Sequence, residues 1–257
     1  MTEHLKLINT GPQPETGRFV MTETAKDILR TLGLVRGRPG GAMTMIAAAP
    51  GMGKTETLLH YLQSATRTYL VTCVAGEASP LNLAFGVMRS LDLGEPNNCR
   101  MPSERLRIAE TIGPEGMLIM DEAQNLVQRY PRGGANYDAL EWLRALAEDG
   151  CFSLVLSGDL KLLDAMGHLP QLRSRMRRPV VVKRVPQADV EALAARRGLT
   201  DARVIDALFT VARQHGALRD VANVIDHAGI FARGGTVDLP HVLAAIADLK
   251  LQPKGGK

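Results

Sequence analysis

The stretch AAAPGMGKTET, residues 47–57, decides the fold. It overlaps a short apolar run, AMTMIAAA at residues 42–49, and leads into KTETLLHYLQSA at residues 54–65, where apolar residues recur at helical spacing. A buried strand, a glycine-rich turn and a helix that begins with Lys-Thr form an arrangement in which backbone N–H groups converge on phosphate oxygens. The stretch therefore predicts a loop that binds a polyphosphate. The alternative is a Gly/Pro turn with an incidental lysine.

Each residue type in this loop has a physical reason to be there. Gly51 and Gly53 permit close approach of the backbone to a ligand. We expect Lys54 to pair with the β- and γ-phosphates of ATP and the Thr55 hydroxyl to ligate Mg²⁺. The motif G-x-x-x-x-G-K-[ST] begins with glycine, whereas this chain has Ala48, at a strand end that accommodates a methyl group. The expected nucleotide-binding residues are Pro50, Gly51, Met52, Gly53, Lys54, Thr55 and Glu56.

A pair of acids ends a second apolar run, GMLIMDEAQ at residues 116–124. In proteins with a phosphate loop, a carboxylate at the end of a later buried strand holds the nucleotide's Mg²⁺. We expect Asp121 to hold Mg²⁺ through water, and Glu122 to orient or deprotonate the water that attacks the γ-phosphate. The alternative is a charge pair at the start of a helix, where acids interact favourably with the helix dipole.

Apolar runs alternate with helical patterns up to residue 185. Continuous apolar runs of this length are typical of strands buried on both faces of a parallel sheet; they lie at residues 42–49, 68–74, 116–121, 152–158 and 179–185. The alternation predicts an α/β fold, a five-stranded parallel sheet flanked by helices. From Pro186 onward four amphipathic segments predict a small all-α lid. The expected domains are an irregular segment 1–21, a nucleotide-binding domain 22–185, a helical lid 186–250 and a flexible tail 251–257.

Composition excludes several classes of protein. The 257 residues carry a formal charge of +4, and no apolar run approaches the roughly 18 residues that a membrane span needs. The N-terminal sequence lacks the apolar core of a signal peptide. Three widely spaced cysteines without a CxxC pair fit reduced thiols, and no histidine pattern indicates zinc. We therefore expect a cytoplasmic protein without membrane contact, whose basic charge weakly favours an anionic partner.

The order of these motifs resembles that of the AAA+ ATPases over roughly residues 20–250. The resemblance implies that Ser157, in LVLSGD, is the sensor-1 residue that helps to hold the attacking water or the γ-phosphate. The segment PQLRSRMRRP is similar to the one that carries the arginine finger, which a neighbouring subunit contributes; Arg175 is expected, with Arg173 and Arg177 as the other candidates. Arg219, in HGALRDVANVI, matches sensor 2. The alternative for these arginines is a solvated basic surface.

Two further stretches, DALEWLRALAEDGCFSLVLSGD and LPQLRSRMRRPVVVKRVPQADVEALAARRGL, resemble the transposition ATPases. This group includes the phage Mu transposition protein B, transposon ATPases and ExeA-like proteins. The resemblance implies a slow Mg²⁺-dependent ATPase, stimulated by DNA or a partner, which oligomerises as a ring or helical filament on double-stranded DNA and delivers it to a transposase. The Mu protein has a helix-turn-helix domain before its ATPase, for which this chain has too few residues, so we expect the ATPase oligomer itself to bind DNA.

Two alternatives to transposition stay open at this stage. The first is a helicase loader or replication initiator, which would use the same ATPase core to load another ring. The second is an ExeA-like ATPase with no role on DNA.

DNA contacts are expected in two basic stretches that the family places at the central channel, NNCRMPSERLR at residues 97–107 and QRYPRGGANY at residues 128–137. Arginines with few aromatic neighbours suit phosphates, which give little sequence preference and a steep salt dependence. Arg100 also precedes a helix start expected at Ser103, where N–H groups could meet a phosphate. The candidates are Arg100, Arg105 and Arg132, followed by Arg107 and Arg129, and the alternative is that each is a plain surface charge.

Overall fold

The computed structural model describes residues 19–36, 38, 40–214 and 216–252. Most of the expected irregular segment 1–21 and of the expected tail 251–257 therefore lies outside the described residues. The chain forms two compact units, each with its own apolar core. The sheet unit comprises Arg30–Ala47 and Leu58–Val180. The helical unit comprises Phe19–Leu29, Ala48–Thr57 and the residues from Val181 onward.

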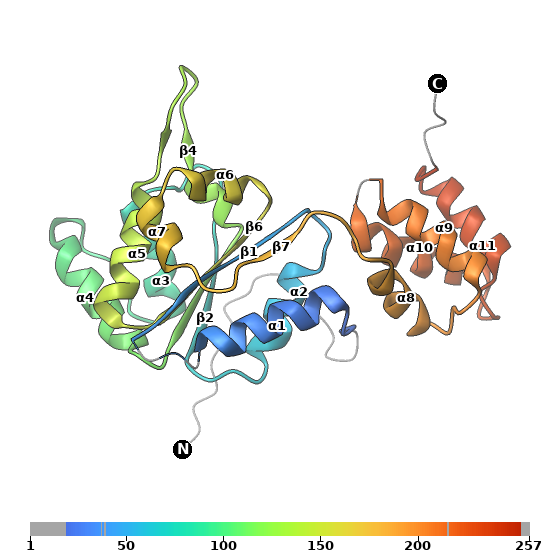
Figure 1. Ribbon diagram of the computed structural model, residues 1–257, viewed down its shortest axis with the longest axis horizontal. Coiled ribbons are helices and arrows are strands. Elements are labelled where there is room, and N and C mark those ends of the chain that lie inside the picture. Colours follow the sequence, from blue (N-terminus) through green and yellow to red (C-terminus); the bar gives the residue numbers. More distant parts are fainter. Residues whose placement is uncertain (1–18, 37, 39, 215, 253–257) are drawn as a thin grey trace. The chain divides into compact units, whose positions relative to one another are not determined.

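The expected five-stranded parallel sheet is confirmed, with the strand order β2-β3-β6-β1-β7 (Figure 1). Its strands are β1 Met43–Ala48, β2 Thr68–Thr72, β3 Met117–Asp121, β6 Ser153–Gly158 and β7 Val180–Val182. In the parallel register, Leu156 of β6 lies opposite both Met45 of β1 and Met120 of β3. The carboxyl ends of these three strands therefore lie at the same edge of the sheet, which is where ligands bind in open α/β sheets.

Helices cover both faces of the sheet. One face packs against a core formed with α3 Pro80–Ser90, α4 Met101–Ile112, α5 Asp138–Gly150, α6 Lys161–Gly167 and α7 Pro170–Arg175. Because side chains alternate along a strand, Ile46, Ile119 and Val155 face the other side, where they are fully buried. The C-terminal half of α1 (Glu23–Arg36) packs on that side, since the Ser153 hydroxyl donates to the Val35 carbonyl at 3.2 Å.

The expected start of α4 at Ser103 is wrong by two residues. A 3₁₀ turn, Asn98–Arg100, precedes the helix, and the Asn97 side chain accepts a hydrogen bond from the Cys99 N–H at 3.0 Å. This capped turn leads directly into α4, which begins at Met101 with Pro102 in its first turn.

The glycine at the end of α5 is required for packing and not for its backbone angle. Helix α5 ends at Gly150, and the next residue, Cys151, is the one in the left-handed conformation, with φ 51°. A Cβ on Gly150 would lie 2.9 Å from the Ala109 carbonyl oxygen of α4. The absence of a side chain at Gly150 therefore lets α4 and α5 approach closely.

A short antiparallel hairpin, which the sequence pattern does not predict, follows β3. Its strands are β4 Gln128–Arg129 and β5 Ala135–Asn136, and Figure 1 shows it projecting away from the sheet. Gly133 and Gly134 have φ values of 91° and 90°, which favour glycine and close the turn. Arg132 is exposed in this turn.

The four expected helices of the C-terminal region are confirmed. They are α8 Gln187–Ala195, α9 Ala202–Ala212, α10 Ala217–Phe231 and α11 Leu239–Asp248. Helix α10 packs against each of the other three. The buried apolar residues of this bundle form one core with Ala48, the last residue of β1, and with Met52, which follows that strand. Within the part of the chain that the structure describes, no helix is long and apolar enough to cross a membrane.

A buried carboxylate attaches the start of α1 to this bundle. Asp189, which is fully buried in the first turn of α8, accepts a 2.7 Å hydrogen bond from the Glu23 N–H. The Thr24 hydroxyl and N–H also donate to it, and the Thr22 hydroxyl accepts from the Ala25 N–H at 3.0 Å. Since a helix leaves its first N–H groups without intrahelical partners, Asp189 and Thr22 together complete the first turn of α1.

Asp189→Ala should lower the free energy of unfolding by about 2–4 kcal/mol, because it leaves the buried donors of Glu23 and Thr24 without an acceptor. Urea denaturation followed by circular dichroism measures this loss. Asp206→Ala, at an exposed aspartate of α9, is the matched control and should change stability by less than about 0.5 kcal/mol. Equal effects of the two substitutions would contradict the capping role.

Candidate functional site

The phosphate loop, residues 49–53, joins β1 to α2 (Lys54–Leu62) and belongs to the helical unit. Gly51 and Gly53 have φ values of 78° and 79°, in the left-handed region that favours glycine. The Gly53 carbonyl accepts from the Thr57 N–H at 3.0 Å and from the Thr57 hydroxyl at 2.8 Å, so Gly53 lies directly before α2 and accepts its first hydrogen bond. The loop thus ends at a helix N-terminus, whose N–H groups and dipole favour an anion.

The loop is packed against the first turn of α10. The Gly51 carbonyl accepts from the Arg219 N–H at 3.2 Å, and a Cβ on Gly51 would lie 2.0 Å from the Gly216 carbonyl oxygen. Gly51 is therefore required both by its backbone angle and by this close approach. The contact brings two expected site residues together, since it places the Arg219 backbone against the loop while the Arg219 side chain is exposed.

Lys54 is buried although it carries a charge. Its Nζ donates to the carbonyl oxygens of Ala48 at 2.8 Å and Ala49 at 3.3 Å, and only 7% of the residue is exposed. Ala48 itself is fully buried in the core of the helical unit, which explains how alanine occupies the first position of the motif. Met52 is buried in the same core, so its role is in packing. Three other expected nucleotide-binding residues are exposed, namely Pro50 in the loop and Thr55 and Glu56 in the first turn of α2.

The carboxyl edge of the sheet brings two further expected residues together. Asp121, the last residue of β3, is 1% exposed, and the fully buried Ser157 hydroxyl of β6 donates to its Oδ1 at 2.8 Å. Glu122 follows with a left-handed backbone, φ 54°, and is half-buried. Because the backbone turns at Glu122, the chain leaves the sheet there instead of continuing the strand.

Gln124 is a site residue that sequence reasoning missed. Its Nε2 donates to Glu122 Oε2, and its Oε1 accepts from the Asp159 N–H at 2.9 Å. A Cβ on Gly158 would lie 2.5 Å from that Oε1, so glycine at the end of β6 makes room for the amide. The amide therefore connects Glu122 to the chain after β6. The sequence shows Gln124 two residues after Glu122, in DEAQ, but a glutamine at that spacing does not by itself indicate a site residue.

Cys73 lies close to the acid pair but does not supply a nucleophile. Its N–H donates to the Asp121 carbonyl at 2.8 Å, and its carbonyl accepts from Asn125 Nδ2 at 3.0 Å. Burial, with smaller contributions from the charges of Asp121 and Glu122, raises the pKa of the Cys73 thiol to about 12. Since only the thiolate is strongly nucleophilic, this thiol stays protonated and unreactive near neutral pH.

The residues expected to hold Mg²⁺ have suitable chemistry. Mg²⁺ in nucleotide sites keeps several waters and takes one or two protein oxygens in addition to substrate phosphates. Thr55, an exposed residue in the first turn of α2, carries a hydroxyl, and Asp121 carries a carboxylate whose Oδ1 accepts from Ser157. Each is an oxygen donor of the kind that Mg²⁺ takes.

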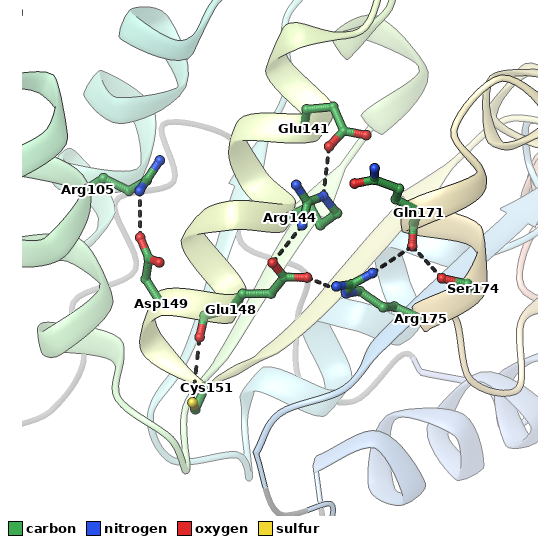
Figure 2. A network of polar contacts seen from close by, with 9 residues as sticks. All are labelled: Arg105, Glu141, Arg144, Glu148, Asp149, Cys151, Gln171, Ser174 and Arg175. Atoms are coloured by element: carbon green, nitrogen blue, oxygen red, sulfur yellow. Dashed lines mark hydrogen bonds and ion pairs between the residues drawn. The ribbon is translucent and has the colours of Figure 1, made fainter.

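Arg175 takes part in a network of ion pairs with α5 (Figure 2). Its Nε pairs with Glu148 Oε1, and its Nη1 donates to the Gln171 carbonyl at 3.2 Å. The second oxygen of Glu148 accepts from Arg144 Nη1 at 2.6 Å, and Arg144 Nε pairs with Glu141 at 2.7 Å. The hydrogen bond to Glu141, with further contributions from Glu148, raises the pKa of Arg144.

This network lies at the amino edge of the sheet. The Arg177 N–H donates to the carbonyl of Met43, the first residue of β1, at 2.7 Å. Asp121 lies level with Ile46, three residues further along β1, or about 10 Å at 3.3 Å per residue. The structure therefore does not bring Arg175 to the acid pair of its own chain. The other candidates, Arg173 and Arg177, are exposed in the same segment.

The candidate DNA-contacting arginines differ in their surroundings. Arg105 pairs with Asp149 at 2.7 Å, and Arg107 donates to the Leu93 carbonyl at 2.9 Å. Arg100, which precedes α4, and Arg132, in the β4–β5 turn, are exposed, and neither forms an ion pair with any residue that the structure describes. Arg129 is exposed in β4.

Two family models match the chain. The model described as "AAA domain" matches residues 38–166, which is half of the chain, and the one described as "Mu B transposition protein, C terminal" matches residues 174–249.

Curated relatives and solved structures are similar to the chain over most of its length. ATP-dependent target DNA activator B of Escherichia phage Mu is 27% identical over 230 residues, 86% of this chain and 69% of that protein. Mu-like prophage FluMu DNA transposition protein B of Haemophilus influenzae is 27% identical over 213 residues, 80% of this chain and 70% of that protein. Cdc6p from Pyrobaculum aerophilum has a TM-score of 0.62 at 16% identity, over 88% of this chain and 66% of that one.

The chain thus spans about two-thirds of the length of each of these proteins. The likeness to Cdc6p, at 16% identity, shows the fold alone. The AAA domain match covers the strands β1, β2, β3 and β6 and the helices between them, and it includes the phosphate loop and the acid pair. The chain therefore belongs to the AAA domain family of ATPases.

Proposed function

We propose that this chain is an Mg²⁺-dependent ATPase that assembles on double-stranded DNA, without sequence preference, and delivers that DNA to a transposase. The observation that carries the proposal is the match of residues 174–249 to the C-terminal model of the Mu B transposition protein, directly after an AAA domain match. Two relatives at 27% identity are named as a target DNA activator and a DNA transposition protein. Replication initiation rests on the fold alone, so we do not propose it.

Each site residue has a proposed role in hydrolysis. The N–H groups of the loop and the first turn of α2 bind the phosphates, and Lys54 exchanges its backbone carbonyl partners for phosphate oxygens. Thr55 and Asp121 are the residues that would hold Mg²⁺, which would screen the phosphate charge when bound. Glu122 orients or deprotonates the attacking water, and Gln124 fixes the Glu122 carboxylate. Ser157 orients Asp121.

Two arginines complete the proposed machinery. Arg219 reaches the nucleotide from the helix whose first turn contacts the phosphate loop. Arg175 lies at the amino edge of the sheet, away from the acid pair of its own chain, and this supports a role at the nucleotide of a second copy. A guanidinium there stabilises the charge that develops on the transferred phosphoryl group.

Arg100 and Arg132 are the proposed DNA contacts. Both are exposed without an ion-pair partner in the described residues, so a phosphate would not have to displace a carboxylate. Arg105 is a weaker candidate, because Asp149 already balances its charge.

Substitutions in the nucleotide site test the ATPase. Lys54→Ala should weaken ATP binding by about 10- to 100-fold, because it removes a charged donor to the phosphates. Glu122→Gln should retain ATP binding and slow hydrolysis by at least about 100-fold. Isothermal titration with ATP and a phosphate-release assay measure the two effects. Normal ATP affinity in Lys54→Ala would overturn the assignment of the phosphate loop.

The Arg175 substitution tests assembly. Arg175→Ala should bind ATP normally and hydrolyse it about 1,000-fold more slowly, because the transition-state contact comes from a neighbour. Mixing it with Glu122→Gln should restore part of the activity, since some interfaces then combine an intact Arg175 with an intact Glu122. Arg173→Ala, at another candidate for the finger in the same segment, is measured in the same two assays. No restoration in any mixture would exclude this segment as the source of a finger.

Duplex binding with ATP across a salt series tests the DNA contacts. Arg100→Ala with Arg132→Ala should weaken binding to all sequences alike and reduce the slope of log affinity against log salt by about 0.9 for each lost phosphate contact. Arg105→Ala, at an arginine paired with Asp149, is the control and should change the slope less. If the unsubstituted chain shows no ATP-dependent duplex binding, the transposition proposal is wrong and an ATPase without a DNA role is favoured.

A further inference from the structure

A pocket rich in arginine opens at the amino edge of the sheet. Its volume is about 370 Å³, and its charged lining residues are Arg38, Arg175, Arg177 and Glu148. The floor comes from the start of β1 and the residues before it, including Gly41 and Met43. Three guanidinium groups around one carboxylate give the pocket an excess of positive charge, which favours an oxyanion.

Glu148 is the only carboxylate among the residues that line this pocket. One of its oxygens pairs with Arg175, and the other accepts from Arg144 at 2.6 Å (Figure 2). Arg144 is itself fixed by Glu141, at 2.7 Å, and its side chain is only 18% exposed. Because Arg144 holds the Glu148 carboxylate in position, less side-chain entropy is lost when Arg175 pairs with it than in an isolated surface pair.

The ion pair also determines where Arg175 points. Its Nη1 donates to the Gln171 carbonyl, one turn earlier in α7, so the guanidinium folds back along its own helix toward α5. A guanidinium in this position presents Nε and Nη1 to partners within the chain. An anion that binds the Nε edge of this guanidinium must therefore replace Glu148.

We propose that Glu148 is a positioning residue, which holds Arg175 neutralised in the isolated protomer until the terminal phosphate of a nucleotide on a second copy of the chain replaces the carboxylate. This inference rests on the proposed function of Arg175. The exchange is favourable because a phosphate carries more negative charge than a carboxylate and accepts the planar guanidinium through two oxygens. The exchange requires assembly, because the Glu148 carboxylate belongs to the same chain as Arg175. It acts at an effective concentration in about the millimolar range, which exceeds the concentration of a dilute free anion.

The pairing should therefore raise the protein concentration that assembly requires. With a non-hydrolysable ATP analogue and Mg²⁺, Glu148→Gln should assemble at a two- to fivefold lower protein concentration than the unsubstituted chain, because an exposed ion pair has about that influence on an equilibrium. Sedimentation velocity over a protein dilution series measures the midpoint. Asp149→Asn is the matched control, because Asp149 is the next carboxylate in α5 and pairs with Arg105, not with Arg144 or Arg175. Its midpoint should not move.

A double substitution separates this effect from a change in folding. In the Arg175→Ala background, Glu148→Gln should no longer shift the midpoint, because there is no guanidinium left to release. Glu148→Asp, which keeps the charge but shortens the side chain, should shift the midpoint in the same direction as Glu148→Gln. Thermal unfolding midpoints identify any variant that is simply unstable.

The outcomes of this series are distinct. Equal midpoints for Glu148→Gln and Asp149→Asn overturn the inference while leaving the proposed ATPase intact. A shift that persists without Arg175 also overturns it, since Glu148 would then act through another residue. If no variant assembles with nucleotide at any concentration, the proposed assembly is wrong, and the inference that rests on it falls with it.

Discussion

The parallel register of β1, β3 and β6 is the constraint on which the rest of the site depends. Because Leu156 lies opposite both Met45 and Met120, the three strands end at one edge, and the Ser157 hydroxyl meets the Asp121 carboxylate there. A slip of one residue would turn Asp121 to the other face and separate it from Ser157. The continuous apolar core on both faces fixes this register, so burial of Met, Ile, Leu and Val side chains determines where the polar groups meet.

The phosphate loop is held by the helical unit. Ala48 and Met52 are buried in the core of that unit, and the first turn of α10 contacts Gly51. Two different requirements therefore act on one loop, since its backbone turns with a positive φ at Gly51 and also fits against Gly216 and Arg219. Glycine at position 51 satisfies both, because it adopts the left-handed conformation and leaves no side chain at the contact.

Charge is distributed between the two edges of the sheet. The carboxyl edge carries Asp121 and Glu122, whereas the amino edge carries the arginines around the pocket beside Glu148. This separation keeps the arginines from neutralising the acids of their own chain. An assembly in which the amino edge of one copy meets the nucleotide of the next would bring the opposite charges together, which is the electrostatic basis of the proposed stimulation by assembly.

The sequence alone determined the five strands, the four C-terminal helices and the motif residues, because buried strands and amphipathic helices have short, local periodicities and the glycine-lysine loop has a local pattern. The start of α4, the β4–β5 hairpin and the Asp189 cap needed the tertiary structure. Asp189 and Thr24 are distant in the chain, and Gly150 is required by a contact with Ala109 in another helix. Gln124 and the Arg175–Glu148 pair likewise depend on distances between elements. Local sequence sets which elements form, whereas hydrogen bonds and ion pairs between elements are set only when the apolar cores pack.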